Sequence, residues 1–182
     1  MVGVSNHHVH LTEDVYKRLF SAPLTKKRDL HQIGEFASNQ LVAIETEKGR
    51  ISNVRVVGPL RDYNQVEISR SDAYTLGINP PVRRSGVLEN SESITIIGEK
   101  DSITLENVCI VSNRHVHMNE TLAKELGVVD NQMVQIKVLG DKSCILDAFI
   151  KISDNGYFEL HLDLDDANAA GLKNGDEVTL LF

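Results

Sequence analysis

The chain has 182 residues, enough for one compact domain or two small ones, and 41% of them are hydrophobic. Its 26 acidic residues outnumber the 19 basic ones and give a formal net charge of -7, which argues against nonspecific nucleic-acid binding because that needs a basic surface. The two cysteines, Cys109 and Cys144, are too few for a disulfide framework, so we expect a cytoplasmic protein. No apolar run approaches the roughly 20 residues of a membrane span, and the first residues do not resemble a secretory signal.

The residue pattern predicts a few short helices among many short strands. Thr12 and Asn119 can cap helices over residues 13–20 and 120–126, and two further helices are expected over 71–77 and 165–171. The strand-like runs are rich in Val and Ile and cover residues 41–46, 50–57, 65–69, 93–98, 102–112, 133–138, 145–153, 157–162 and 177–182. Strands this short and numerous favour barrels over an open parallel sheet, so we predict a mainly β protein of the α+β class with short helices.

Two halves of the chain carry the same motifs in the same order. The segment Val4–Leu11 (VSNHHVHL) recurs 107 positions later as Val111–Met118 (VSNRHVHM). More faintly, Glu67–Ala73 resembles His161–Ala167, and each is followed by a glycine at the same offset. We therefore predict two small β-barrel lobes related by an internal pseudo-twofold repeat. The expected lobes are residues 1–97 and 98–182, with a boundary near 97–107 where the lobes can swap segments.

Four of the seven histidines form two His-x-His motifs, His8 with His10 and His115 with His117. Alternate residues of a strand point to the same face, so the two imidazoles of each motif project together, which suits two ligands of one transition metal. The alternative is a pair of surface histidines that was duplicated with the repeat. His7 points the other way on such a strand and is expected not to bind metal.

Each half then offers a third ligand at the repeat-equivalent position, Glu67 in the first half and His161 in the second. A His/His/Glu set and a His/His/His set are both typical of catalytic zinc, with positions left open for water or substrate. A solvated strand carboxylate and an ordinary edge histidine are the alternatives for these two residues. Arg61 lies on a Gly-Pro turn six residues before Glu67, where it could hold phosphate through bidentate hydrogen bonds or be an ordinary surface arginine.

These motifs resemble the zinc-dependent phosphate propanoyltransferase family, the PduL-type phosphotransacylases of propanediol-utilising bacteria. The matching segments run in the family's order and cover essentially the whole chain. They are Ser5–Leu11, Gly58–Arg61, Gln65–Ser69, Ser112–Met118 and His161–Ala169. The resemblance implies transfer of a short acyl group, propionyl or acetyl, between coenzyme A and inorganic phosphate, with acyl-CoA, phosphate and acyl phosphate as the binding partners.

The resemblance further implies a homodimer whose chains each hold two zinc ions close together in a cleft. The implied ligands are His8, His10 and Glu67 for one zinc and His115, His117 and His161 for the other. Arg61 matches the arginine that holds phosphate and is needed for catalysis. Ser5, Arg55 and Asn168 fall where the family contacts coenzyme A.

Two features depart from the family's pattern. The first motif usually reads Arg-His-Val-His, and here His7 replaces the arginine that the second copy keeps as Arg114. His8 also comes almost at once, which leaves no room for the extension that directs some members into bacterial microcompartments, so we expect a free cytoplasmic form. Two other functions remain open: a zinc hydrolase acting on a phosphate ester or thioester, and a non-enzymatic metal-binding or scaffold protein.

Overall fold

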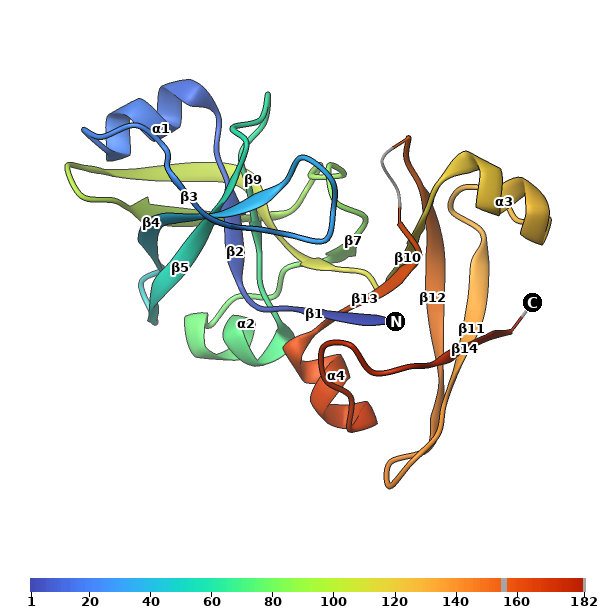
Figure 1. Cartoon of the computed structure of the whole chain (residues 1–182). Coiled ribbons are helices and arrows are strands. Elements are labelled where there is room, and N and C mark those ends of the chain that lie inside the picture. Colours follow the sequence, from blue (N-terminus) through green and yellow to red (C-terminus); the bar gives the residue numbers. More distant parts are fainter. Residues whose placement is uncertain (155–156, 182) are drawn as a thin grey trace. The chain divides into compact units, whose positions relative to one another are not determined.

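The computed structural model describes residues 1–154 and 157–181, and these contain fourteen strands and four short helices. Figure 1 traces the chain through these elements. Contacts within the chain divide it into two compact units. Unit 1 joins residues 1–6 to residues 113–182, and unit 2 is residues 7–112. The predicted division into residues 1–97 and 98–182 concerns the sequence repeat and remains a prediction. Among the described residues, none of the helices has the length and apolar character needed to cross a membrane.

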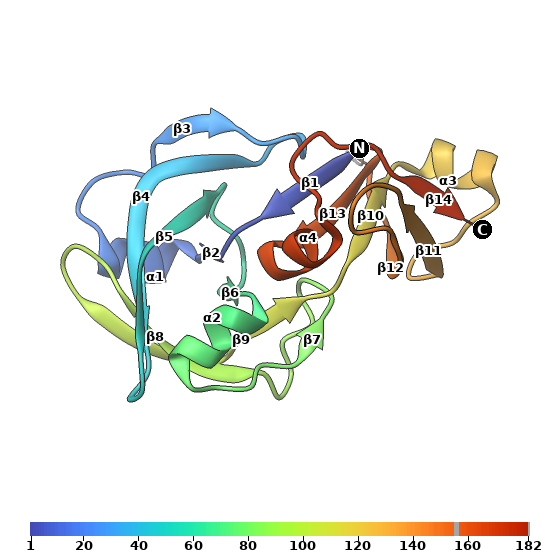
Figure 2. The same cartoon turned by 90° about the horizontal axis from the view of Figure 1, so that it is seen from below.

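Unit 2 is built on a closed six-stranded barrel. Its strands are β2 (His8–His10), β3 (Lys26–Asp29), β4 (Phe36–Glu45), β5 (Arg50–Gly58), β6 (Gln65–Glu67), β7 (Val82–Arg83), β8 (Glu92–Ile97) and β9 (Ser102–Ser112), and its helices are α1 (Glu13–Leu19) and α2 (Arg70–Leu76). Strand pairing runs β4–β5–β2–β6–β9–β8 and returns to β4, and the ring can be followed in Figure 2. Strands β3 and β7 pair with β4 and β9 outside this ring.

Unit 1 is a curled six-stranded sheet. Its strands are β1 (Val2–Ser5), β10 (His115–Met118), β11 (Met133–Val138), β12 (Cys144–Ile152), β13 (Glu159–Asp163) and β14 (Thr179–Leu181), and its helices are α3 (Glu120–Leu126) and α4 (Leu164–Ala170). The strand order is β1-β13-β10-β12-β11-β14. Two backbone hydrogen bonds join Val2 to Gly175 and Asp176, just ahead of β14, so the sheet nearly returns on itself. The expectation of a mainly β fold with two barrel-like lobes is confirmed.

The two units share one local topology, which explains the sequence repeat. In each, the His-x-His strand is parallel to one neighbour (β5 or β12) and antiparallel to another (β6 or β13). β1 directly precedes the first motif in sequence, but it belongs to unit 1, where it pairs with β13. Likewise, β9 directly precedes the second motif but belongs to unit 2, where it pairs with β6. The registers correspond residue by residue, because His8 faces Glu67 where His115 faces His161.

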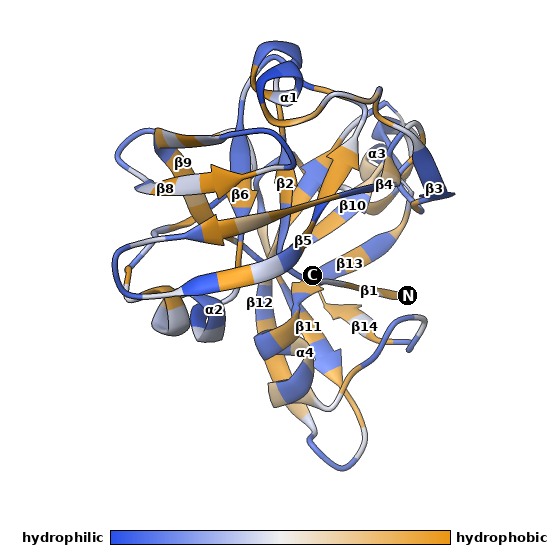
Figure 3. Cartoon of the chain, turned by 90° about the vertical axis from the view of Figure 1, so that its left-hand side faces the viewer, coloured by the Kyte–Doolittle hydropathy of each residue, from blue (hydrophilic) through white to orange (hydrophobic). Residues whose placement is uncertain are grey.

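Alternation of apolar and polar residues fixes which face of each strand is buried. In unit 2, Val9 and Val66 are fully buried in the barrel core, and in unit 1 Val116 and Leu160 take the same place. Bands of hydrophobic and hydrophilic residues alternate along the strands in Figure 3. Because side chains alternate across a strand, the residues on either side of these valines and leucine point to the opposite face, away from the core.

Most predicted elements are present within a residue or two of their expected ends, and Thr12 and Asn119 cap α1 and α3 as expected. Strand β4 begins earlier than predicted, and β1, β3 and β7 were not predicted. β3 consists entirely of exposed charged residues at the edge of the sheet, so it has no apolar pattern to reveal it. The strand predicted over 177–182 is seen at Thr179–Leu181, and Phe182 lies outside the described residues.

Candidate functional site

The first predicted ligand group is assembled in unit 2. His8 and His10 lie on β2, and Glu67 lies on β6 directly opposite His8. Their potential ligand atoms all lie within 4.8 Å of one another, and His8 Nε2 is 3.7 Å from Glu67 Oε2. The His8 and His10 rings meet edge to face, with their centroids 5.0 Å apart. The fold therefore brings these three donors to one place on the face opposite the barrel core.

The second predicted group is assembled in unit 1. His115 and His117 lie on β10 and His161 lies on β13 opposite His115, again with ligand atoms within 4.8 Å. The Nε2 atoms of His115 and His117 are 3.1 Å apart. A tetrahedral zinc with bonds of about 2.0–2.1 Å would separate two ligand nitrogens by about 3.3 Å, so this spacing fits shared coordination.

The protonation and the ring orientation of His115 also suit a metal ligand. Burial, reinforced by the nearby charge of Lys151, lowers the pKa of His115 well below its ordinary value, so the ring is neutral at pH 7. Its Nδ1–H donates to the carbonyl oxygen of Asn113 over 2.8 Å. The lone pair is therefore on Nε2, the atom that faces His117, and the carbonyl fixes the orientation of the ring.

Each group combines a buried side with a more accessible one. His10, His115 and His117 are 3%, 8% and 1% exposed. The side chains of His8, Glu67 and His161 are 14%, 13% and 24% exposed. A metal held there would be anchored by the buried imidazoles while an external ligand could approach from the accessible edge.

Sequence reasoning missed two buried polar residues beside these groups. Gln65 lies on β6 opposite His10 and donates to the Glu67 carboxylate. Glu159 lies on β13 opposite His117 and is 2.9 Å from His161 Nε2. The available signal was the repeat itself, because each residue precedes the third donor of its group by two positions.

Arg61 is tied to the end of the first His-x-His strand. Its backbone N–H donates to the carbonyl of Leu11, which directly follows β2, over 2.9 Å. Its guanidinium donates to the Tyr63 hydroxyl over 2.9 Å and to the carboxylate of Glu35. Arg61 is thus paired with a carboxylate, and its role in holding phosphate remains a prediction. Sequence analysis did not find Glu35, which lies in the loop between β3 and β4.

The three residues expected to contact coenzyme A lie on different elements. In unit 1, Ser5 ends β1 and Asn168 is exposed on α4. In unit 2, Arg55 lies on β5 opposite His8 and donates to the carbonyl of Ser38 over 2.9 Å. Arg55 therefore places a cation one strand away from the first ligand group, and the roles of all three residues remain predictions.

The departure at His7 has a structural counterpart in the other repeat. His7 Nδ1 lies 3.2 Å from the Asp72 carboxylate, and Arg114 Nε lies 3.3 Å from the Asp166 carboxylate. Both aspartates occupy the first turn of a helix, α2 or α4. His7 thus preserves the contact that arginine makes in the second copy. Among the described residues, His7 belongs to neither ligand group.

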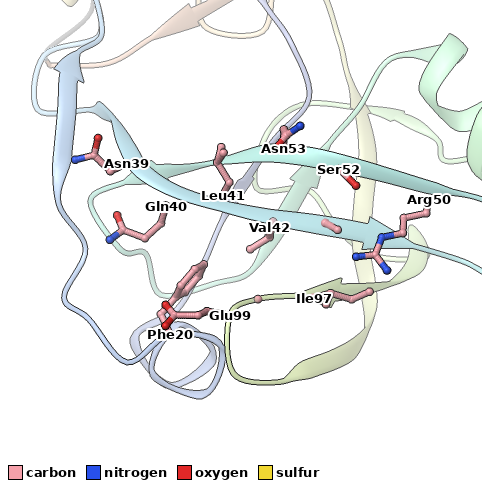
Figure 4. A pocket seen from close by; sticks show the side chains of 12 residues that line it. Phe20, Asn39, Gln40, Leu41, Val42, Arg50, Ser52, Asn53, Ile97 and Glu99 are labelled. Carbon is pink, nitrogen blue, oxygen red and sulfur yellow. The ribbon is translucent and has the colours of Figure 1, made fainter.

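A pocket of about 480 Å³ opens beside β4 and β5 of unit 2, and Figure 4 shows the side chains that line it. Phe20 and Leu41 supply apolar surface, and Arg50 supplies charge. None of the predicted site residues lines this pocket. This pocket is therefore separate from the predicted site residues.

The fold and these groups define a duplicated β-barrel protein with one candidate metal site in each unit. The profile of the family described as phosphate propanoyltransferase matches residues 1–173, and the chain belongs to this family. A phosphate propanoyltransferase of Thermotoga maritima is 43% identical over all of this chain and 88% of the relative. One of Salmonella typhimurium is 41% identical over 95% of this chain and 84% of the relative. The predicted family is confirmed, and the protein is a transferase.

Proposed function

We propose that the protein is a phosphotransacylase that converts acyl-CoA and inorganic phosphate into acyl phosphate and coenzyme A, and the reverse. The acyl group is short, propionyl or acetyl. The observation that carries this proposal is the pairing of each His-x-His motif with a third donor on the next strand, with Arg61 bonded to the end of β2. Relatives named phosphate propanoyltransferase match 95% to 100% of the chain and support the same reaction.

The proposal includes two zinc ions per chain. One would be held by His8, His10 and Glu67, and the other by His115, His117 and His161. When bound, zinc supplies Lewis acidity toward a carbonyl or phosphate oxygen and an affinity for thiolate sulfur. The donor spacing and the neutral imidazole of His115 support this assignment.

Arg61 would hold the attacking phosphate. Its planar guanidinium matches two phosphate oxygens, and phosphate would take the place that the Glu35 carboxylate occupies. A phosphate oxygen then attacks the thioester carbonyl carbon, the C–S bond breaks, and coenzyme A leaves as the thiolate with the bonding electron pair. Arg55 would bind a phosphate group of the coenzyme, while the Ser5 hydroxyl and the Asn168 amide would supply neutral hydrogen bonds.

The state of Cys109 supports direct transfer without a thiol intermediate at that residue. Burial raises the pKa of Cys109 to about 12, so its thiol stays protonated at neutral pH. Because the thiolate is the reactive form, Cys109 is a poor nucleophile. Its side chain is fully buried in the barrel core, out of reach of substrate.

The test combines metal analysis with a coenzyme A release assay. Purified protein is incubated with propionyl-CoA or acetyl-CoA, with and without phosphate, while free thiol is followed and bound metal is quantified. We expect thiol release that depends on phosphate and two zinc ions per chain. Release without phosphate would instead indicate a hydrolase, and bound metal without coenzyme A binding would indicate a scaffold. Light scattering tests the homodimer that the family resemblance implies.

The role of Arg61 has a separate test. Losing one hydrogen bond to a charged group costs about 1.5–3 kcal/mol, so Arg61→Gln should lower turnover by about 10- to 150-fold per lost bond while metal content stays unchanged. Arg50→Gln removes an exposed arginine of the same unit that pairs with Glu45, and it serves as the matched control. If Arg61→Gln removes zinc and leaves turnover per metal unchanged, the assignment is wrong.

A further inference from the structure

Two buried polar side chains occupy the same position in the two units. Gln65 is fully buried and Glu159 is 2% exposed. Each lies two residues before the third donor of its group, on the same strand and the same face. Each also lies opposite the second histidine of the motif, His10 or His117. The repeat has therefore placed a glutamine and a glutamate in equivalent surroundings.

The orientation of the Gln65 amide is determined by its neighbours. The backbone N–H of Gly86 can only donate, and it lies 2.7 Å from Gln65 Oε1. The NH₂ end of the amide therefore faces the other way, where it donates to the Ser85 hydroxyl over 2.9 Å and to the Glu67 carboxylate. Gln65 thus presents a donor to a third ligand that only accepts.

Glu159 presents the opposite character. Its Oε2 atom accepts from the Tyr157 hydroxyl over 2.8 Å and lies 2.9 Å from His161 Nε2. A carboxylate oxygen accepts hydrogen bonds, so Glu159 can accept a proton carried on His161 Nε2. The Tyr157 hydroxyl also lies 2.8 Å from His161 Nε2, so the three groups form one hydrogen-bonded cluster. Tyr157 also stacks on His117, with the ring centroids 5.7 Å apart, and so packs against the ligand group of unit 1.

We propose that Gln65 and Glu159 are positioning residues matched to the third metal ligand of each unit, a donor for the carboxylate ligand and an acceptor for the imidazole ligand. The inference rests on the proposed metal binding by the two groups. It also gives each unit one carboxylate: Glu67 belongs to the His/His/Glu set, and Glu159 lies beside the His/His/His set.

The test measures zinc affinity by chelator competition and the absorption spectrum of the cobalt(II)-substituted protein. Loss of a hydrogen-bonding partner of a ligand typically costs about 10- to 100-fold in metal affinity. We expect Glu159→Gln to weaken one of two zinc sites by this factor and to change its cobalt spectrum. Combining Glu159→Gln with His161→Glu recreates in unit 1 the pair found in unit 2. This double variant should bind zinc more tightly than either single variant, which a merely structural role would not produce.

Controls separate the possible failures. Glu120→Gln removes an exposed carboxylate on α3 and should leave both zinc sites unchanged. If Glu159→Gln does not fold, Tyr157→Phe removes a single hydroxyl of the same cluster and should weaken that zinc site about fivefold. Wild-type protein that binds no metal would refute the proposed function. Wild-type protein with two sites, together with a Glu159→Gln variant of unchanged affinity and spectrum, would overturn this inference alone.

Discussion

Gly3→Ala would add one methyl group beside the ligand group of unit 1, which consists of His115, His117 and His161. Gly3 lies on β1 opposite His161 of β13. A Cβ atom at Gly3 would lie 2.5 Å from Glu159 Oε2 and 3.0 Å from His161 Cδ2. The equivalent position in the other unit is Ile110, opposite Glu67, where a large side chain is accepted. The glycine is therefore needed in unit 1, because the Glu159 carboxylate occupies the space that a side chain would take.

The size of the effect follows from these distances. Ordinary van der Waals contact begins at 3.4 Å, so the carboxylate must retreat by about 0.9 Å to admit the new methyl group. Functional groups need to be held within about 0.5 Å of their working positions, so this displacement exceeds the tolerance of the site. We expect Gly3→Ala to weaken zinc binding in unit 1 by about 10- to 100-fold. Overpacking should also cost about 1–3 kcal/mol of folding stability.

The assay is zinc stoichiometry and affinity below the unfolding temperature, with thermal unfolding measured in parallel. Gly98→Ala is the matched control, since its Cβ would lie 2.6 Å from the side chain and from the carbonyl of Leu19 and contacts neither ligand group. It should lower stability while leaving both zinc affinities unchanged. A Gly3→Ala protein that binds two zinc ions as tightly as wild type would refute the reasoning.

Three further predictions concern other groups. Burial would raise the pKa of Asp72, but the hydrogen bonds that its carboxylate accepts outweigh burial and hold this pKa below the usual value. The ionised Asp72 carboxylate therefore stabilises the folded protein above about pH 3.9, and this stabilisation is lost as the pH falls through the lowered pKa. Asp72→Asn should thus lower the free energy of unfolding, measured in urea, by about 1 kcal/mol at pH 7 and by less at pH 3. An equal loss at the two pH values would contradict the role given to the Asp72 carboxylate. In a Cys144→Ser protein, Cys109 should not react with a thiol reagent until the chain unfolds, because burial raises its pKa to about 12; rapid native reaction would refute it. Glu35→Gln should free Arg61 and lower the KM for phosphate about fivefold, equivalent to about 1 kcal/mol, whereas a raised KM would show that Glu35 helps to position the arginine.

The parts of the site that could be predicted from the sequence depend on local geometry. The spacing of His8 and His10 places both on one strand face, since side chains alternate with a period of two. The repeat identified Glu67 and His161 as equivalent, and the strand registers bear this out. Capping by Thr12 depended only on the residues that follow it in the chain. In each case the information lies within a few residues or in an internal duplication.

Other features were decided by contacts between distant segments. The pairing of Arg61 with Glu35 joins residues 26 positions apart, and Glu35 belongs to a short loop without apolar periodicity. The exchange of β1 and β9 between the two copies of the repeat depends on pairing between segments far apart in the chain, so the local sequence alone did not determine it. In the sequence, Gln65 and Glu159 are not distinguished from other polar residues. Strand pairing buries each of them beside a predicted metal ligand. The sequence by itself determined which side chains could bind metal, whereas only the packing of the strands determined which neighbours orient those side chains and set their charge.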